Sequence, residues 1–156
     1  MGLPPMPHDD RYVRSEEFLT ILKGLWTQPY FSFEGRYYQI DDINLTPPPI
    51  CKPHPTIYFG GESDVGQRLA AKLADVYLIN GRPVDETKVL VDQVRVYAAE
   101  EGREVQFGIS AFVICRDSTV AAQEEHARLH SLRFEEPIAG VDRKVVMIRT
   151  YGYAIG

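Results

Sequence analysis

Apolar side chains near the N-terminus recur at the three- and four-residue spacing of one helix face. The residues with this spacing are Phe18, Ile21, Leu22, Leu25 and Trp26. The pattern predicts an amphipathic helix that follows Asp9-Asp10 and ends before Pro29.

Aromatic residues are frequent in the segment that follows this predicted helix. Aromatic runs at 31–33 and 37–40 flank Glu34-Gly35, a pattern typical of a β-hairpin. The following residues, 41–55, are polar and rich in proline, which fits neither a helix interior nor a central strand. We therefore expect an extended connector over 41–55.

From Thr56 onward, strand and helix patterns alternate strictly. The predicted strand–helix pairs are 56–59 with 63–74, 76–79 with 84–101, and 105–115 with 118–133. Gly102 stands where a glycine commonly follows a helix. Short connections between such units predict a parallel sheet and an α/β fold. The sheet is either doubly wound or an arc of a (β/α)8 TIM barrel, with the N-terminal helix and the hairpin as additions.

The number of units is too small for a whole barrel, which needs about 250 residues. We expect residues 1–156 to form one partial domain, in which residues 134–156 are an atypical tail. Within that tail, residues 145–148 have the apolar character of a strand, but no helix pattern follows them.

Charge and composition exclude several classes of function. The net charge is −5, and the basic residues are scattered, which does not favour nucleic-acid binding. No apolar run approaches a membrane span, and the first residues lack the pattern of a signal peptide. Cys51 and Cys115 form no Cys-x-x-Cys pair. We expect a cytoplasmic protein with no membrane or nucleic-acid partner.

The strongest candidate for chemistry lies where the strand at 56–59 meets its helix. Gly60 and Gly61 let an anion approach the backbone, and Ser63 can cap the helix and offer its hydroxyl. Free N–H groups and the helix dipole at such a position favour a phosphate. The same pattern also fits a plain strand–helix turn with a serine cap and no ligand. The residues alone leave both interpretations open.

A second candidate, a metal site, is weaker. His126 and His130 are four residues apart on the last predicted helix, which is a spacing of metal ligands. No Glu follows His126 in the zinc-protease pattern, and an exposed helix face explains both histidines. We expect no metal.

Four stretches, in matching order and spacing, resemble the bacterial luciferase-like flavin monooxygenases, in particular the branch with alkanesulfonate and dimethyl sulfone monooxygenases. The stretches are His8-Asp9-Asp10-Arg11-Tyr12 with Glu16-Glu17-Phe18, Phe33-Glu34-Gly35-Arg36-Tyr37-Tyr38, Pro55-Thr56-Ile57-Tyr58-Phe59-Gly60-Gly61-Glu62-Ser63 and Ala71-Lys72-Leu73-Ala74-Asp75. The resemblance extends from about residue 8 to residue 130. It implies a (β/α)8 barrel that uses reduced FMN and O2, receives its flavin from an NAD(P)H-dependent reductase, and forms a homo-oligomer at full length.

The resemblance also implies roles for individual residues. In the family the FMN phosphate lies at the start of the corresponding helix. The cofactor-binding residues are therefore expected to be Tyr12, Gly61, Glu62 and Ser63, through backbone amides and the hydroxyls of Tyr12 and Ser63. Alkanesulfonate enzymes carry an Arg and a His at two substrate-facing positions of the strand that here holds Ser110 and Phe112. Without those charges, a neutral sulfone is as well accommodated as an alkanesulfonate.

These implications lead to one expected function and two alternatives. We expect an FMNH2-dependent monooxygenase that oxidises a small organosulfur compound with O2, whereas this chain alone is expected to be inactive. No catalytic acid, base or nucleophile can be assigned, because the family's first and last strands have no counterpart in these residues. The alternatives are a deazaflavin-dependent oxidoreductase of the same fold and a non-catalytic truncated remnant.

Overall fold

The computed structural model describes residues 6–131. In chain order its elements are α1 (His8–Thr27), β1 (Phe31–Glu34), β2 (Gln39–Ile43), β3 (Tyr58–Phe59), α2 (Asp64–Leu73), β4 (Val76–Asn80), α3 (Val84–Glu100), β5 (Gln106–Ser110) and α4 (Thr119–Ser131). The expected tail at 134–156, including the strand considered at 145–148, lies outside the described residues.

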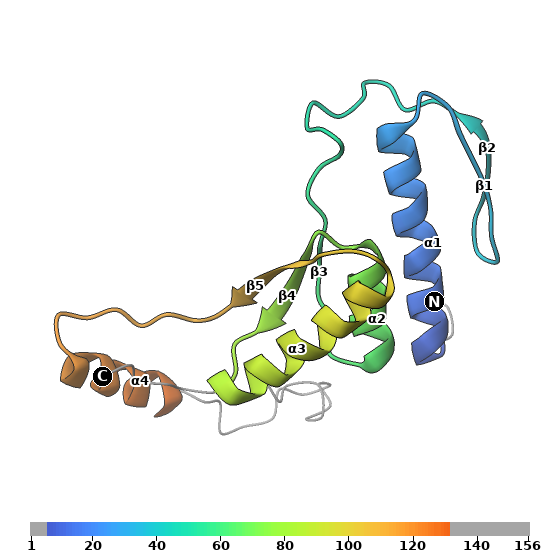
Figure 1. Cartoon of the computed structure of the whole chain (residues 1–156). Helices are drawn as coiled ribbons and strands as arrows, with labels where there is room; N and C mark the ends of the chain where they lie inside the picture. The colour runs from blue at the N-terminus through green and yellow to red at the C-terminus, as the bar shows by residue number, and fades with distance from the viewer. Residues whose placement is uncertain (1–5, 132–156) are drawn as a thin grey trace.

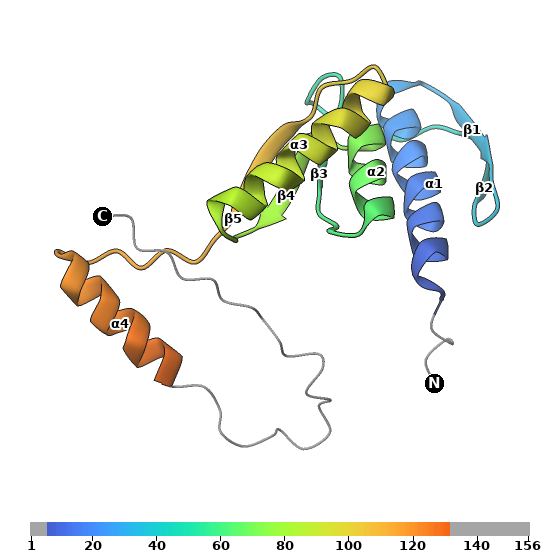
Figure 2. The ribbon, with the colours of Figure 1, turned by 60° about the horizontal axis from the view of Figure 1, so that its bottom comes forward.

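The strands form two separate sheets. β1 and β2 make an antiparallel hairpin, and β3, β4 and β5 make a parallel sheet in chain order. In both views α1 lies between the hairpin and α2 (Figures 1 and 2). The predicted α/β class, with three parallel strands behind an N-terminal helix and a hairpin, is confirmed.

Helices α2 and α3 cover one face of the parallel sheet. Tyr77 and Ile79 of β4 point into this layer and are 0% and 2% exposed. Two buried alanines of α2, Ala70 and Ala71, and the buried Ala74 that follows the helix allow its backbone to approach the sheet and α3 closely. The remaining core side chains come mainly from α3. The core consists of Ile57, Ala70, Ala71, Ala74, Tyr77, Ile79, Leu90, Val94, Tyr97 and Ala98.

The opposite face of the sheet is open apart from Val76, at the start of β4, which is buried. Side chains alternate between faces along a strand, so Tyr58 and Leu78 point away from the helices, and they are 63% and 39% exposed. In a barrel this face is the interior. The sheet is therefore apolar on both faces, as in a parallel sheet covered on both sides.

The segment between β2 and β3 crosses from the hairpin back to the sheet as an extended connector (Figure 1). Most residues of 44–53 are exposed. The connector docks at its end, where the ring of His54 stacks on Trp26 at 6.1 Å between centroids. One Asp75 carboxylate oxygen accepts the N–H of Ile57 at 2.8 Å, which fixes the start of β3. The predicted connector is confirmed, but it begins after Ile43 rather than at Asp41.

The predicted second strand of the hairpin is displaced because α1 supplies a competing acceptor. The Glu17 carboxylate accepts the N–H groups of Arg36, Tyr37 and Tyr38 at 2.8, 2.8 and 3.1 Å. Residues 37 and 38 therefore belong to the turn, and β2 begins at Gln39. The predicted apolar stripe on α1 also needs one correction, because Phe18 is 47% exposed and lies near Tyr38.

The last predicted strand, 105–115, is too long. β5 ends at Ser110, opposite Asn80, where its partner β4 also ends. Beyond that point no strand among residues 6–131 offers a ladder partner. α4 stands apart from the sheet at the end of an extended segment (Figures 1 and 2), and none of its residues is buried. Ile109, which a covering helix would shield, is consequently 56% exposed.

Candidate anion-binding site

Four residues, 60–63, connect β3 to α2. Ser63 is the N-cap of α2: its backbone is extended (φ −69°, ψ 155°), and its Oγ accepts the N–H of Gly66 at 3.3 Å. The Ser63 carbonyl accepts the N–H of Gln67 at 2.9 Å. The predicted cap is confirmed. Because the cap uses Oγ as an acceptor, the hydroxyl hydrogen of Ser63 stays able to donate to a ligand.

Tyr12 of α1 lies over this loop. A Cβ added to Gly61 would stand 3.1 Å from the Tyr12 Oη and 3.2 Å from the Gly66 Cα. A Cβ added to Gly66 would stand 3.0 Å from the same Oη. An ion pair of 2.6 Å between Glu16 and Lys72 joins α1 to α2 beside this contact. Glycine at 61 and 66 is therefore what lets the tyrosine hydroxyl reach the start of α2.

Several donors of the loop have no acceptor in the described part of the chain. Within residues 6–131, the N–H groups of Gly61, Glu62 and Ser63 make no hydrogen bond. The Gln67 side chain folds back over the loop, where its Nε2 donates to the Glu62 carbonyl at 2.8 Å. Its Oε1 is buried without a hydrogen-bond partner among those same residues. Unpaired backbone N–H groups at a helix start attract an anion.

The floor of the loop is held by a buried tyrosine. Tyr77 of β4 donates its hydroxyl to the Gly61 carbonyl at 2.8 Å. Burial, reinforced by the nearby Glu62 carboxylate, raises the pKa of Tyr77 to about 12. The hydroxyl therefore remains protonated and able to donate across the physiological pH range.

Each carboxylate next to Ser63 is paired with an arginine. Glu62 pairs with Arg82 and accepts the Asn80 amide at 3.3 Å. Asp64 accepts from the Arg68 Nε at 3.0 Å and from the Tyr97 hydroxyl. The hydrogen bonds from Tyr97 and Arg68 lower the pKa of Asp64. The loop thus combines unpaired N–H donors with carboxylates whose charge is already balanced.

The structure brings together Tyr12, Gly61, Glu62 and Ser63, the four residues expected to bind the cofactor. The two residues expected to face the substrate, Ser110 and Phe112, do not lie together in this way. Ser110 ends β5 beside Asn80, on the open face of the sheet. Phe112 lies beyond the strand and is 94% exposed. Sequence reasoning missed Tyr77, Asn80 and Arg82. For Asn80 and Arg82 the usable signal was their position at and just after the end of the second parallel strand, because α/β folds bind ligands at that edge. Tyr77, the second residue of that strand, carries no such signal.

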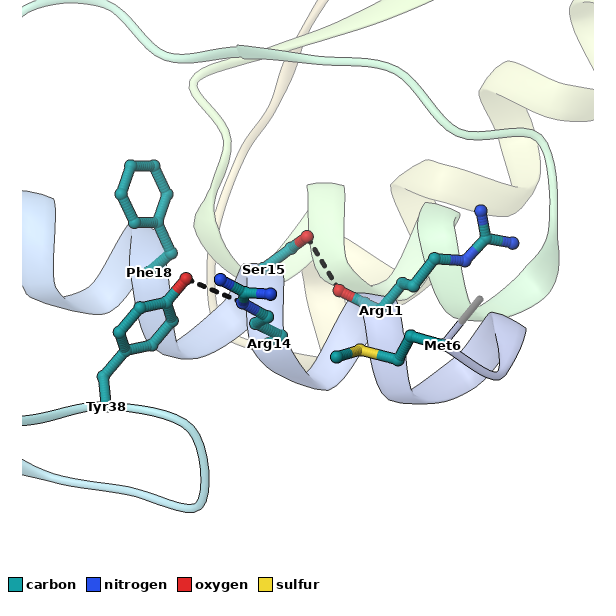
Figure 3. A pocket seen from close by; sticks show the side chains of 6 residues that line it. All are labelled: Met6, Arg11, Arg14, Ser15, Phe18 and Tyr38. Atoms are coloured by element: carbon teal, nitrogen blue, oxygen red, sulfur yellow. Dashed lines mark hydrogen bonds between the residues drawn. The ribbon is translucent and has the colours of Figure 1, made fainter. Parts of the chain in front are cut away.

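A hollow of about 430 Å³ lies elsewhere, between α1 and the hairpin (Figure 3). Its lining includes Met6, Ser15 and Phe18. Arg14 donates to the Tyr38 hydroxyl at 2.9 Å there, while the Arg11 side chain points away from that pair (Figure 3). The hollow contains none of the residues around the anion loop, so it is a separate surface feature.

The part of the chain that the structure describes shows neither a metal-binding cluster nor a membrane-spanning helix. In that part, no three or more His, Cys, Asp or Glu side chains are grouped to hold a metal ion. Its helices include none with both the length and the apolar character required to cross a membrane.

Comparison with known proteins supplies the family. The family model described as luciferase-like monooxygenase matches residues 1–153. The chain belongs to the luciferase-like monooxygenase family. It is 41% identical over 145 residues to the FMNH2-dependent dimethylsulfone monooxygenase of Pseudomonas putida, an alignment that covers 93% of this chain and 40% of that protein. The chain therefore spans about two fifths of the length of this luciferase-like relative.

Solved structures of similar shape agree with the fold of the luciferase-like family. A riboflavin lyase, solved with modified FMN and its substrate riboflavin, gives a TM-score of 0.70 at 18% identity, covering 82% of this chain and 34% of that chain. The EDTA monooxygenase of Chelativorans sp. BNC1 gives a TM-score of 0.69 at 23% identity, covering 81% of this chain and 36% of that chain. At these identities the likeness concerns the fold alone. The parallel sheet is thus part of a (β/α)8 barrel, as the family resemblance implied.

Proposed function

We propose that this chain contributes the phosphate-binding loop to an FMNH2-dependent monooxygenase that acts on a small organosulfur compound. The observation that carries the proposal is the loop at 60–63, where unpaired N–H groups, a capping serine and the Tyr12 hydroxyl converge at the start of α2. Bound reduced flavin supplies the electrons that activate O2, and the chain's own residues bind and orient it.

The residues fit FMN on three physical grounds, two for its phosphate and one for a hydroxyl group. Gly61 leaves no side chain between an anion and the backbone amides. The hydroxyls of Tyr12 and Ser63 are neutral donors, and a phosphate is an acceptor. The Gln67 Oε1, buried and without a partner among residues 6–131, is an acceptor for a hydroxyl of a ligand. In this proposal Tyr12, Gly61, Glu62 and Ser63 hold the phosphate.

The proposed substrate is a neutral sulfone rather than an alkanesulfonate. The Pseudomonas putida relative is named for dimethylsulfone. Ser110, at the end of β5, is uncharged and stands beside the amide of Asn80. A sulfonate requires a cation, whereas sulfone oxygens are satisfied by neutral donors of this kind. Ser110 and Phe112 are proposed to face the substrate.

The whole enzyme implied by the proposal has several partners. An NAD(P)H-dependent reductase would supply the reduced flavin in the cytoplasm, and the full-length protein would be a homo-oligomer. Residues 1–156 would form one part of a single barrel domain, and they would not turn over substrate alone. The deazaflavin-dependent alternative is disfavoured by a 41% identical relative that is named for FMNH2.

Flavin-fluorescence titration of the full-length protein with FMN and with riboflavin, which lacks the phosphate, tests the proposal. Ser63→Ala removes one hydrogen bond to a charged group, worth about 1.5–3 kcal/mol, and should weaken FMN roughly ten- to a hundredfold. Riboflavin should be nearly unaffected. Gly61→Val should also weaken FMN, because its side chain blocks the approach to the backbone. Supplied with reduced FMN, the wild type should oxidise dimethyl sulfone faster than an alkanesulfonate.

Ser118 offers a matched control, because its Oγ accepts the N–H of Ala121 at 3.2 Å near the start of α4. Ser118→Ala removes the same kind of cap away from the loop and should change neither titration. Equal losses of FMN and riboflavin in Ser63→Ala would mean that Ser63 is only a helix cap, and the phosphate assignment would be wrong.

A further inference from the structure

We propose that Arg82 makes the loop at 60–63 selective for a phosphate, by cancelling the negative charge that Glu62 would otherwise present to it. This inference rests on the proposed function. The backbone of Glu62 lies between two of the phosphate-binding residues, while its side chain reaches the end of β4 and pairs there with Arg82. Arg82 is thus a positioning residue that acts through Glu62.

Contacts with Asn80 hold the Glu62–Arg82 ion pair in place. The Asn80 amide donates to Glu62 at 3.3 Å, and the Arg82 Nε lies 3.4 Å from the Asn80 carbonyl oxygen. The Arg82 side chain is only 16% exposed, although Glu62 is 52% exposed. One ion pair therefore ties the loop after β3 to the loop after β4, at the edge of the sheet where the ligand is proposed to bind.

An unpaired Glu62 carboxylate would repel a bound phosphate, and the ion pair with Arg82 offsets this repulsion. A phosphate dianion next to a free carboxylate is repelled, because like charges in contact oppose binding. Asp64, the other carboxylate beside Ser63, is paired with Arg68, but those side chains are 66% and 52% exposed and solvent screens them. Glu62 has the more buried cation. Its neutralisation should therefore matter more for a charged ligand.

The experiment compares FMN and riboflavin titrations of Arg82→Gln, Glu62→Gln, the double variant and Arg82→Lys in the full-length protein. Arg82→Gln leaves the carboxylate unpaired and should weaken FMN roughly tenfold or more at low salt, with riboflavin changed less than about twofold. Glu62→Gln should bind FMN at least as tightly as the wild type. The double variant and Arg82→Lys should recover most of the lost affinity.

Varying the ionic strength shows whether Arg82→Gln weakens FMN through lost charge or through altered loop geometry. The FMN defect of Arg82→Gln should shrink as salt rises toward about 1 M, where the screening length falls to about 3 Å. Arg95→Gln removes an arginine of α3 that is 65% exposed and pairs with Asp92 rather than with a residue of the loop, and it should change neither titration. It controls for the change in net charge.

The outcomes distinguish the inference from the proposed function. If Ser63→Ala weakens FMN selectively but Arg82→Gln weakens both flavins equally, or the double variant gains nothing, the phosphate site stands and the charge argument is overturned. If Arg82→Gln does not fold, Glu62→Gln becomes the deciding variant, and a loss of FMN affinity in it overturns the charge argument. A wild type that binds the two flavins with equal affinity overturns both proposals.

Discussion

Replacing Tyr77 by phenylalanine would remove a single oxygen atom from the floor of the anion loop. Tyr77 is 0% exposed, and its ring packs edge-on against Phe107 with centroids 6.4 Å apart. Phenylalanine fills the same space, so the packing is retained. The one interaction lost is the 2.8 Å hydrogen bond from the Tyr77 hydroxyl to the Gly61 carbonyl.

The expected cost follows from that lost bond. Leaving a buried acceptor without its donor costs about 1–3 kcal/mol. The Gly61 residue is only half-buried, so water can replace part of the interaction, and we expect about 1–2 kcal/mol. An equilibrium for local opening of the loop should then shift by roughly five- to thirtyfold.

Amide hydrogen exchange of the full-length protein measures this opening directly. The N–H of Gln67, which donates to the Ser63 carbonyl at 2.9 Å, should exchange roughly five- to thirtyfold faster in Tyr77→Phe. Amides in the middle of α3, around Val94, should be unchanged. Tyr30→Phe is the matched control, because Tyr30 is 60% exposed and its hydroxyl has no hydrogen bond within residues 6–131.

The pH dependence gives a second, independent check. The pKa of Tyr77 is raised by burial to about 12, from an ordinary value of 10. A raised pKa means that the stabilisation is complete below pH 10 and is lost as the pH rises through 12. The difference between wild type and Tyr77→Phe should therefore be constant near neutrality and shrink between pH 10 and 12. Equal exchange at pH 7, or a difference that persists above pH 12, would refute the reasoning.

Two further predictions concern the hairpin turn, which Glu17 holds, and the end of α3, which Gly102 follows. Desolvation raises the pKa of Glu17, but the N–H groups of Tyr37, Arg36 and Tyr38 outweigh it and hold the pKa below its ordinary value. Glu17→Gln should therefore lower the Tm at neutral pH, with the gap from wild type closing as the pH falls below about 4 in a thermal melt. Gly102 has a φ of +64°, which alanine adopts only with strain. Gly102→Ala should therefore lower the free energy of unfolding by about 1 kcal/mol in urea denaturation, and Gly102→Asn should lower it less.

The elements that the sequence predicted best are those whose signals are local. Ser63 as N-cap and Gly102 after α3 depend on backbone conformations of their own residues, and both are confirmed. The errors concern contacts between distant segments. The Glu17 carboxylate accepts the N–H groups of residues 37 and 38 although it lies about twenty residues away in the sequence. No periodicity within the hairpin shows that a side chain competes with the strand partner for these N–H groups.

The same division applies to the candidate site. The glycines and serine of the loop carry a local pattern, so the loop could be found from the sequence. Tyr77 and Arg82 belong to the next strand and its following turn, and only the register of the parallel sheet brings them to the loop. A single sequence holds no signal for that register beyond the order of the strands.

The exposed connector over 44–53 tolerates change in length. Tyr12 reaches the loop through the packing of α1 on α2, not through the chain that joins the hairpin to β3. Closing a flexible loop of twice the length costs only about 0.6 kcal/mol more in entropy. Insertions over 44–53 can therefore accumulate during evolution while Tyr12 keeps its place above Gly61.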